Sequence, residues 1–253
     1  MKISIVTAVY NRVSTVGQAI ESVQGQTHPD IEHLIQDGGS KDGTLDVIHR
    51  LANGTTCLVS EPDGGIYDAI NLGIGRASGD VVGLMHSDDA FAHNDVLTRV
   101  AQLFEDPDVD AVYGDLDYVS ATDDSRVIRH WKSGPYHRGL LKRGWMPPHP
   151  TFYMRRHLFE TWGLYDTSFR IAADYDAMLR YLWTGQIRAA YLPEVMVKMR
   201  LGGASNGSLK RILRKSREDY RALRNNGVGG MGSLALKNTS KLKQFIMRDS
   251  QSK

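Results

Sequence analysis

The chain has 253 residues, of which 41% are hydrophobic and 24% charged, and its formal net charge is +2. This composition excludes disordered and fibrous chains, and the length suits one large α/β domain with an appendage. No apolar stretch approaches the roughly 20 residues that span a bilayer, and no signal-peptide core is visible. The single cysteine, Cys57, permits no intramolecular disulfide, which suits a reducing compartment. We therefore expect a cytoplasmic protein whose membrane contact, if it has any, is peripheral.

The first part of the chain alternates strands with helices. Residues 2–9 are β-branched and apolar on both faces, which is typical of a strand buried in a parallel sheet. The same pattern then repeats. Further strands are predicted at 33–36, 57–60 (a buried strand that contains Cys57) and 81–85, and helices at 14–24, 45–51 and 66–75. Strands that alternate with helices imply right-handed crossovers and a mostly parallel sheet covered on both faces.

The second part is less regular. A helix is predicted at 96–104 and a strand at 111–113, but four prolines interrupt the stretch 115–150. A helix returns at 175–183, where apolar residues recur at helical spacing before Gly185.

Charge divides the chain into two regions. Residues 208–253 carry 12 Lys or Arg against 3 Asp or Glu, so a strongly basic tail follows an acidic body. We predict a catalytic domain over 1–207 and a basic helical tail over 208–253, which seeks an anionic partner.

Polar clusters follow three of the predicted strands: Thr7 with Asn11, Asp37 with its glycines, and residues 86–89. In open parallel sheets ligands bind at the carboxyl ends of the strands. Asp88 and Asp89 follow the strand 81–85 directly, and carboxylates are natural ligands of Mg²⁺ or Mn²⁺. The alternative is that Asp89 caps a turn and Asp88 is solvated.

Several ordered motifs narrow the interpretation. They are SIVTAVYNR, IQDGGSKDGT, SEPDGGIYDAINLGIGRASGD, LMHSDD, MPPHPTFYMRR, FRIAADYDAMLR and MRLGGASN. In this order and spacing they resemble glycosyltransferase family 2, and most of all its bacterial members that build surface polysaccharides. The resemblance covers about residues 2–206. It implies an α/β fold of GT-A type, Rossmann-like, with a nucleotide-binding half at about 1–115 and an acceptor half at about 116–207.

The same resemblance assigns roles in donor binding. It implies that Thr7 and Asp37 line the nucleoside pocket, that Asp88 contacts the ribose side or the metal shell, and that Asp89 is the final acid of a motif that holds Mn²⁺ or Mg²⁺. The chain departs from the family pattern at two positions. Gly38 stands where a second acid is usual, and Ser87 replaces the first acid of the metal motif, which leaves Asp89 as the main protein ligand.

Other candidates lie further along the chain. His149 matches a family histidine near the donor phosphates or the acceptor, and either metal ligation or a structural role fits it. Arg200, followed by glycines, suggests a phosphate-binding charge, or else a plain surface turn. Trp145 suggests stacking on a sugar ring, although a core position is the commoner fate of such a residue.

Asp174 is the best candidate for the catalytic base. It matches the acid of the family's acidic pair, with Ala173 in place of the usual Glu, and a base near the acceptor hydroxyl is needed because that hydroxyl is barely acidic. The alternatives are a helix cap at Asp174 and Asp176 as the base; the two acids point to opposite sides of a helix. A literal D-x-D at Asp115 and Asp117 ranks lower as a metal site, and Asp115 is assigned to the acceptor side.

The sequence thus predicts a metal-dependent, inverting transfer of a sugar from a nucleotide-sugar, UDP-hexose by default, to a glycan or lipid-linked acceptor. The alternatives are a non-catalytic carbohydrate-binding or scaffold protein and a nucleotidyltransferase, although the glycine- and lysine-rich loop of the latter is missing. The basic tail is expected either to hold the enzyme on the anionic inner face of the cytoplasmic membrane or to pack on the domain. Few aromatic residues are interleaved with its charges, which disfavours a nucleic-acid partner.

Overall fold

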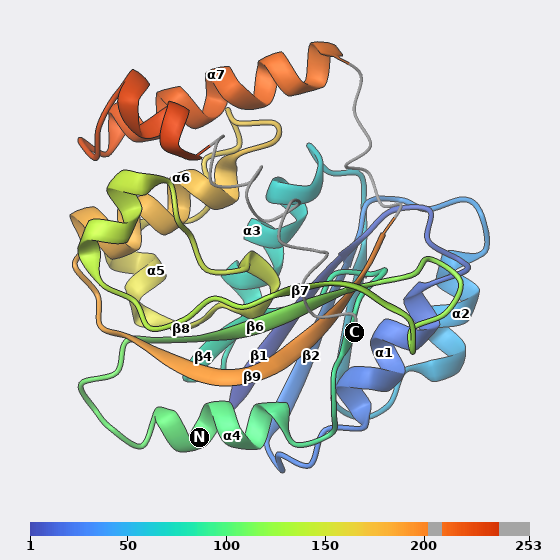
Figure 1. The fold of residues 1–253 in the computed structure, drawn as a ribbon. Coiled ribbons are helices and arrows are strands. Elements are labelled where there is room, and N and C mark those ends of the chain that lie inside the picture. Colours follow the sequence, from blue (N-terminus) through green and yellow to red (C-terminus); the bar gives the residue numbers. More distant parts are fainter. Residues whose placement is uncertain (202–208, 238–253) are drawn as a thin grey trace, which may run out of the picture.

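The computed structural model describes residues 1–201 and 209–237. Within these residues one nine-stranded sheet has the order β3-β2-β1-β4-β8-β6-β9-β5, with β7 paired to β6 (Figure 1). The strands are β1 (Ile3–Val9), β2 (Ile31–Asp37), β3 (Thr56–Ser60), β4 (Val81–Leu84), β5 (Ala90–Phe91), β6 (Ala111–Val119), β7 (Val127–Trp131), β8 (Tyr153–Arg155) and β9 (Ala189–Arg200).

Helices cover both faces of the sheet. They are α1 (Val16–Gln24), α2 (Thr44–Leu51), α3 (Ile66–Arg76), α4 (Val96–Leu103), α5 (His157–Trp162), α6 (Ala173–Leu179) and α7 (Leu209–Asn225). Shorter helical segments are η1 (Arg138–Arg143), η2 (His149–Thr151) and η3 (Arg180–Thr184), the last of which continues α6 as a π-helical turn.

The first half is a parallel sheet. Strand β1 pairs in parallel with β2 and β4, and β2 pairs in parallel with β3. All seven residues of β1 are buried, because its two faces contact different helices. Val9 packs with Ile20 of α1 and Ile48 of α2, whereas Val6 lies in the cluster that contains Ile70 of α3.

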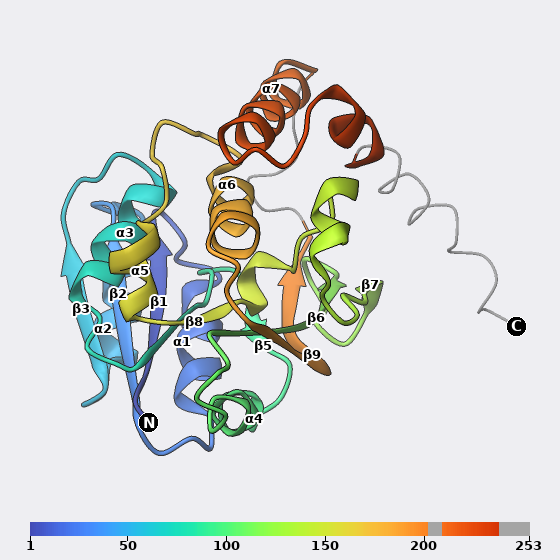
Figure 2. The same cartoon turned by 90° about the vertical axis from the view of Figure 1, so that its left-hand side faces the viewer.

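The second half extends this sheet with mixed pairing. Strand β8 runs antiparallel to β4 and β6, β9 runs parallel to β6, and β5 runs antiparallel to β9. Helix α4 packs on one face of this half, and α6 lies on the other with α7 above it (Figure 2). The order of strands and helices agrees with the mostly parallel α/β fold that the sequence predicts.

Three local predictions differ from the structure. Cys57 is exposed, not buried, because β3 is the edge strand and its outer residues face solvent. The strand predicted at 111–113 continues to Val119, because β7 and β9 pair with both of its edges. The helix predicted at 175–183 begins earlier, at Ala173, and ends in the π-helical turn.

The described part of the basic tail packs on the domain. Ala222 and Leu223 of α7 are completely buried, and α7 lies over α6 in both views (Figures 1 and 2). Its other face is exposed, including Ile212 (57%) and Leu213 (66%). Among the residues that the structure describes, none of the helices combines the length and apolarity required to cross a membrane.

Candidate functional site

The turn after β2 is organised by Asp37. Its Oδ2 atom accepts hydrogen bonds from the backbone N–H groups of Gly39 and Ser40, both at 3.0 Å, and from the Ser60 hydroxyl at 2.6 Å. Its Oδ1 accepts the Ser40 hydroxyl. The side chain is fully buried, so Asp37 uses its acceptor capacity to shape the turn.

Thr7 lies beneath the same edge of the sheet. Its side chain is completely buried, and its Oγ1 atom is 2.9 Å from Nε2 of His33 on the neighbouring strand. Burial lowers the pKa of His33 to about 4, so this imidazole is neutral near pH 7. Thr7 thus links β1 to β2 through a buried side-chain contact.

An acid from another segment occupies the space left by Gly38. A Cβ atom on Gly38 would lie 2.7 Å from Oδ2 of Asp63, which precedes α3. Asp63 Oδ1 accepts the Gly65 N–H at 2.8 Å. Burial raises the pKa of Asp63, and the nearby carboxylates add to the effect. Asp63 therefore occupies the space that a side chain at position 38 would fill.

Tyr10 borders the same turn. It follows β1 and is 59% exposed, which is unusual for a large aromatic side chain. The next residue, Asn11, holds this segment against the turn: its N–H donates to the Ser40 hydroxyl at 2.8 Å, and its Oδ1 accepts the Lys41 N–H at 3.0 Å. An exposed ring and a carboxylate thus flank the carboxyl ends of β1 and β2.

Asp89 follows β4 and is only 3% exposed. Its Oδ1 accepts the backbone N–H of Arg200 at 3.2 Å, whereas its Oδ2 is buried and has no hydrogen-bond partner among the described residues. Burial raises the pKa of Asp89 well above its usual value, and the adjacent Asp88 adds to this, while Arg200 opposes it. An unpartnered buried carboxylate oxygen next to a second carboxylate fits a divalent cation, whose charge would offset both.

The guanidinium of Arg200, at the end of β9, pairs with Asp124. Nε lies 2.9 Å from Oδ1, and a terminal nitrogen lies 2.8 Å from Oδ2. Gln18 of α1 contacts both partners. The pKa of Arg200 is raised, first by the Asp124 hydrogen bond and to a smaller extent by the charges of Asp88 and Asp89. The guanidinium therefore interacts with these two carboxylates as well as with Asp124. We call Asp88, Asp89 and the end of β9 at Arg200 the acidic corner.

Asp174 lies at the start of α6. Its Oδ1 is 3.3 Å from the Tyr67 hydroxyl of α3, which also donates to the Ile171 carbonyl at 2.8 Å. Asp176 points elsewhere: its carboxylate accepts from Asn226 at 3.0 Å and lies 3.5 Å from Arg180. The two acids therefore face different surroundings, as their spacing on a helix requires.

Two histidine rings lie close to each other near the end of β4. The rings of His86 and His149 are 5.6 Å apart, and Nε2 of His149 lies 2.9 Å from the Tyr165 hydroxyl. Burial lowers the pKa of His149 to about 4, and the charge of Asp174 opposes this only partly. Burial also lowers the pKa of His86, against the charges of Asp88 and Asp174. Asp88 and Asp174 therefore both lie within electrostatic range of the His86 ring.

The sequence of the chain matches a known family. The model of the family described as "Glycosyl transferase family 2" matches residues 4–171. The chain belongs to glycosyltransferase family 2. The fold class and the family predicted from the sequence are thereby confirmed.

Relatives within the family have related names. A "PGL/p-HBAD biosynthesis glycosyltransferase" from Mycobacterium bovis (strain BCG / Pasteur 1173P2) is 31% identical over 208 residues, which cover 80% of this chain and 78% of that protein. An uncharacterized glycosyltransferase of Nostoc sp. is 30% identical over 218 residues, or 81% of this chain and 66% of that protein.

Solved structures share the fold. S. aureus TarS 1-349 superposes with a TM-score of 0.68 at 18% identity and covers all of this chain and 74% of its own. The mannosyltransferase PcManGT from Pyrobaculum calidifontis, in complex with GDP-Man and Mn²⁺, gives 0.67 at 17% identity, covering 98% of this chain and 76% of that one. TarS 1-349 in complex with UDP-GlcNAc gives 0.69 at 16%, covering 98% and 73%.

Asp115 and Trp145, the two residues assigned to the side of the sugar acceptor, both hydrogen-bond to Ser133. Asp115, 4% exposed, accepts the Ser133 N–H at 2.7 Å and the Tyr191 hydroxyl at 2.8 Å. Trp145 donates its indole N–H to the Ser133 carbonyl at 3.1 Å and stacks on Tyr136, with ring centroids 5.5 Å apart. Asp115 and Trp145 therefore belong to one cluster of hydrogen-bonded and aromatic side chains. In the literal D-x-D, Asp117 pairs instead with His130, at 2.6 Å.

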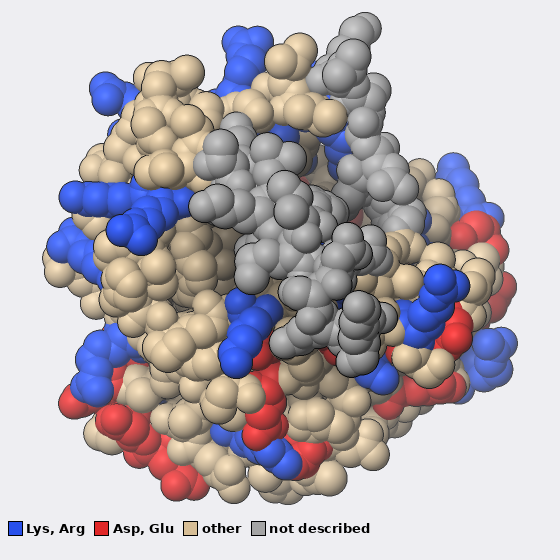
Figure 3. Space-filling view, in the orientation of Figure 1, with Lys and Arg blue, Asp and Glu red and all other residues tan. Residues whose placement is uncertain are grey.

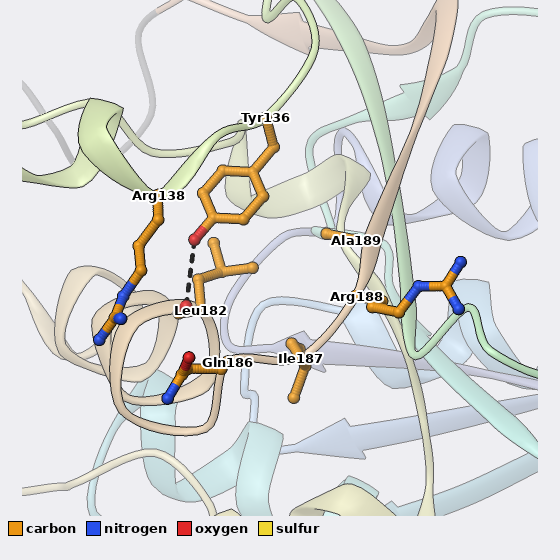
Figure 4. Close-up of a pocket in the computed structure, with 7 residues that line it drawn as sticks. All are labelled: Tyr136, Arg138, Leu182, Gln186, Ile187, Arg188 and Ala189. Carbon is orange, nitrogen blue, oxygen red and sulfur yellow. Dashed lines mark hydrogen bonds between the residues drawn. The ribbon is translucent and has the colours of Figure 1, made fainter.

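A surface cavity of about 340 Å³ lies near the start of β9, and neither Asp89 nor Asp174 lines it (Figure 4). Within it the Tyr136 hydroxyl donates to the Leu182 carbonyl at 3.0 Å. It is lined by Tyr136, Arg138, Leu182, Gln186, Ile187, Arg188 and Ala189. The residues of the family motifs do not line it, and β9 runs from this end to Arg200 at the acidic corner.

Sequence reasoning assigned no role to Asp63, Tyr10 or Tyr67, and it named His86 only as part of the polar cluster at 86–89. The signal for Asp63 was the glycine at position 38, since a missing side chain leaves room for another. The others are ordinary residues inside recognised motifs, and only the structure brings their side chains to the acids.

Proposed function

We propose that this glycosyltransferase moves a hexose from a nucleotide-sugar donor, UDP-linked by default, to a hydroxyl group of a glycan or lipid-linked acceptor, with inversion at the anomeric carbon. The observation that carries the proposal is the pairing of two differently placed acids in one site. Asp89 presents a buried oxygen that has no hydrogen-bond partner among the described residues, and His86 lies within electrostatic reach of both Asp88 and Asp174. One corner therefore suits a cation with a diphosphate, and the other suits a base.

Donor binding rests on the carboxyl edge of β1 and β2. We propose that the exposed Tyr10 ring stacks on the nucleoside base and that Asp63 accepts a hydrogen bond from an N–H group of the base, while Asp37 and Thr7 keep the turn in shape. The structural neighbours carry GDP-Man or UDP-GlcNAc, which supports a nucleotide-sugar in general.

The metal proposal starts from Asp89. Its Oδ2 and the neighbouring Asp88 would hold Mn²⁺ or Mg²⁺, and neutral His149, whose ring lies 5.6 Å from that of His86, is a further candidate ligand. Among the described residues no group of three or more His, Cys, Asp or Glu is arranged to hold a metal by itself, so donor phosphates and water would supply the remaining ligands, as is usual for Mg²⁺. Such a cation would stabilise the negative charge on the leaving diphosphate.

Asp174 would act on the acceptor. As the acceptor oxygen bonds to the anomeric carbon, the carbon–oxygen bond to the diphosphate breaks and the hydroxyl proton passes to Asp174. The Tyr67 hydroxyl, 3.3 Å from Oδ1, orients this carboxylate. A single displacement opposite the leaving group inverts the configuration.

The first test removes the carboxylate of Asp89. In Asp89→Asn we expect Mn²⁺ affinity, titrated in the presence of UDP, to fall by about tenfold or more. Asp117→Asn is the matched control, since it belongs to the literal D-x-D, and its affinity should stay near that of the wild type. A loss in the control and none in Asp89→Asn would move the metal to the other motif.

The second test separates binding from transfer. Asp174→Asn should keep donor affinity and lower the transfer rate by about 100-fold or more, because an amide cannot accept the proton. Retained anomeric configuration in the product, read by NMR, would overturn the single displacement. Activity close to that of the wild type would remove Asp174 as the base.

We also propose that the enzyme works at the cytoplasmic face of the membrane, where lipid-linked acceptors lie. On the exposed face of α7, Ile212 and Leu213 accompany the exposed Arg214 and Arg217, and Lys and Arg side chains appear over α7 in Figure 3. Near an anionic leaflet each such cation contributes about 1 kcal/mol. Packing of α7 on the domain is compatible with this, because its two faces differ.

Vesicle sedimentation tests the membrane proposal. The intact protein should bind anionic vesicles at low salt, and the double variant Ile212→Ser and Leu213→Ser should bind less. Val127→Ser, which alters another exposed apolar residue, on β7 (48%), serves as the control. Equal binding to neutral vesicles, or no change in the double variant, would contradict the proposal.

A further inference from the structure

Helix α7 reaches the segment that carries Asp174. Oε2 of Glu218 accepts two backbone hydrogen bonds, from the N–H of Ile171 at 2.8 Å and from the N–H of Ala172 at 3.0 Å. These amides immediately precede α6, whose N-cap residue, Ala172, has no side chain that could cap the helix. Glu218 lies 47 positions later in the chain, so a residue of the basic tail fixes the start of α6.

The same segment is held from the opposite direction by α3. The Ile171 carbonyl accepts the Tyr67 hydroxyl at 2.8 Å, and this hydroxyl is the group that also reaches Asp174. The peptide units before Asp174 therefore have their N–H groups bound by α7 and a carbonyl bound by α3. Buried side chains of Ala172 and Ala173 leave the backbone little room to shift.

Further contacts fix α7 on both sides of this clamp. Arg221 pairs with Asp166 at 3.2 Å, and its guanidinium lies 3.8 Å from the centre of the Phe169 ring. Beyond the helix, Asn226 donates to Asp176 at 3.0 Å. Helix α7 thus contacts the chain before and after Asp174, and it cannot move relative to α6 without breaking these contacts.

We propose that Glu218 is a positioning residue for the reaction: its carboxylate holds the Ile171–Ala172 backbone so that Asp174 faces the acceptor hydroxyl. This inference rests on the proposed function of Asp174. In the proposed reaction Glu218 itself touches neither the donor nor the sugar acceptor. Because a small misplacement of a reacting group costs a large factor in rate, the loss of Glu218 should act on the chemical step and spare donor binding.

Three variants test the role in the full chain. Glu218→Ala removes the oxygen that accepts both hydrogen bonds, Glu218→Gln keeps an oxygen in the same place, and Asn225→Ala changes an exposed, uncharged side chain of the same helix. We expect Glu218→Ala to lower kcat by about tenfold or more, with KM for the donor and UDP affinity unchanged within about twofold. Glu218→Gln should restore most of kcat, and Asn225→Ala should match the wild type.

Hydrogen exchange gives a readout that does not depend on activity. The Ile171 and Ala172 amides should exchange faster in Glu218→Ala than in the wild type, and at nearly the wild-type rate in Glu218→Gln. Unchanged protection in Glu218→Ala, or a loss that appears only in donor KM, would overturn the positioning role. A wild-type protein without any transfer activity would instead refute the proposed function, while the exchange rates would still report on the clamp.

Discussion

Two glycines of α3 provide a test of how tightly this helix packs on the sheet. A Cβ atom on Gly73 would lie 2.3 Å from Cγ1 of Val6, which is 1% exposed in β1. A Cβ atom on Gly75, two residues further along the same helix, would meet nothing within 4 Å. The two alanine variants therefore share the same gain in helix propensity and differ only in packing.

The expected changes in the free energy of unfolding have opposite signs. Replacing glycine by alanine inside a helix stabilises by about 1 kcal/mol, and Gly75→Ala should show most of that gain. At Gly73 the added methyl group must displace Val6 or the helix, and such overpacking costs about 1–3 kcal/mol or more. We expect Gly73→Ala to destabilise the protein by about 1–2 kcal/mol after the propensity gain is counted.

Urea unfolding at constant pH measures both variants, provided that the slope with denaturant is unchanged. In a protein of this size about 1 kcal/mol corresponds to a shift in Tm of about 2–4 °C. If Gly73→Ala stabilised the protein as much as Gly75→Ala does, the close approach of α3 to β1 would be refuted, and with it the support that α3 gives to the site.

Three further predictions follow. In the folded state the pKa of Glu32 is about 2 instead of 4.5, because hydrogen bonds from two serines and Lys2 outweigh the effect of burial; it therefore stabilises above pH 4.5 and loses this contribution as the pH falls towards 2. In Glu32→Gln the free energy of unfolding should fall by about 1 kcal/mol less than in the wild type as the pH is lowered, a value that allows for the partial solvent exposure of Glu32. Equal pH profiles of the two proteins would contradict this. Leu223→Ala should cost about 2–5 kcal/mol and Leu213→Ala under about 0.5 kcal/mol in urea unfolding; similar costs would mean that α7 does not pack as described. Tyr10→Ala should weaken UDP binding by about tenfold, the loss of one stacked ring, measured by calorimetry, and unchanged affinity would remove Tyr10 from the nucleoside site.

Periodicity was sufficient to predict the alternating first half, because strands buried on both faces leave long apolar runs. It failed where burial depends on neighbours that are distant in sequence. The short apolar run at Cys57 looks the same in an edge strand as in a central one. In β6 the acids Asp115 and Asp117 interrupt the apolar pattern that would indicate a strand. They are accommodated there because Asp115 bonds to Ser133 and Asp117 to His130, both from later segments.

The site was predicted as a set of positions, and its contacts were not. The acids Asp89 and Asp174 were singled out from motifs, and their roles stay predictions. That Asp37 accepts the Ser60 hydroxyl of β3, and that Arg200 pairs with Asp124, 76 positions earlier, depends on long-range folding. Asp63 illustrates the same limit, since its place beside Gly38 exists only once two turns meet.

The contact between Asp89 and Arg200 joins positions 111 residues apart, and among the described strands β5, directly after Asp89, pairs with β9 alone. Contacts of such long sequence separation form late in folding. During synthesis, β1 to β4 emerge well before β9, so a nascent chain that stops short of residue 200 has the strands of the nucleotide edge without the amide that fixes Asp89. We therefore expect the proposed metal site at Asp89 to form only when almost the whole domain has left the ribosome.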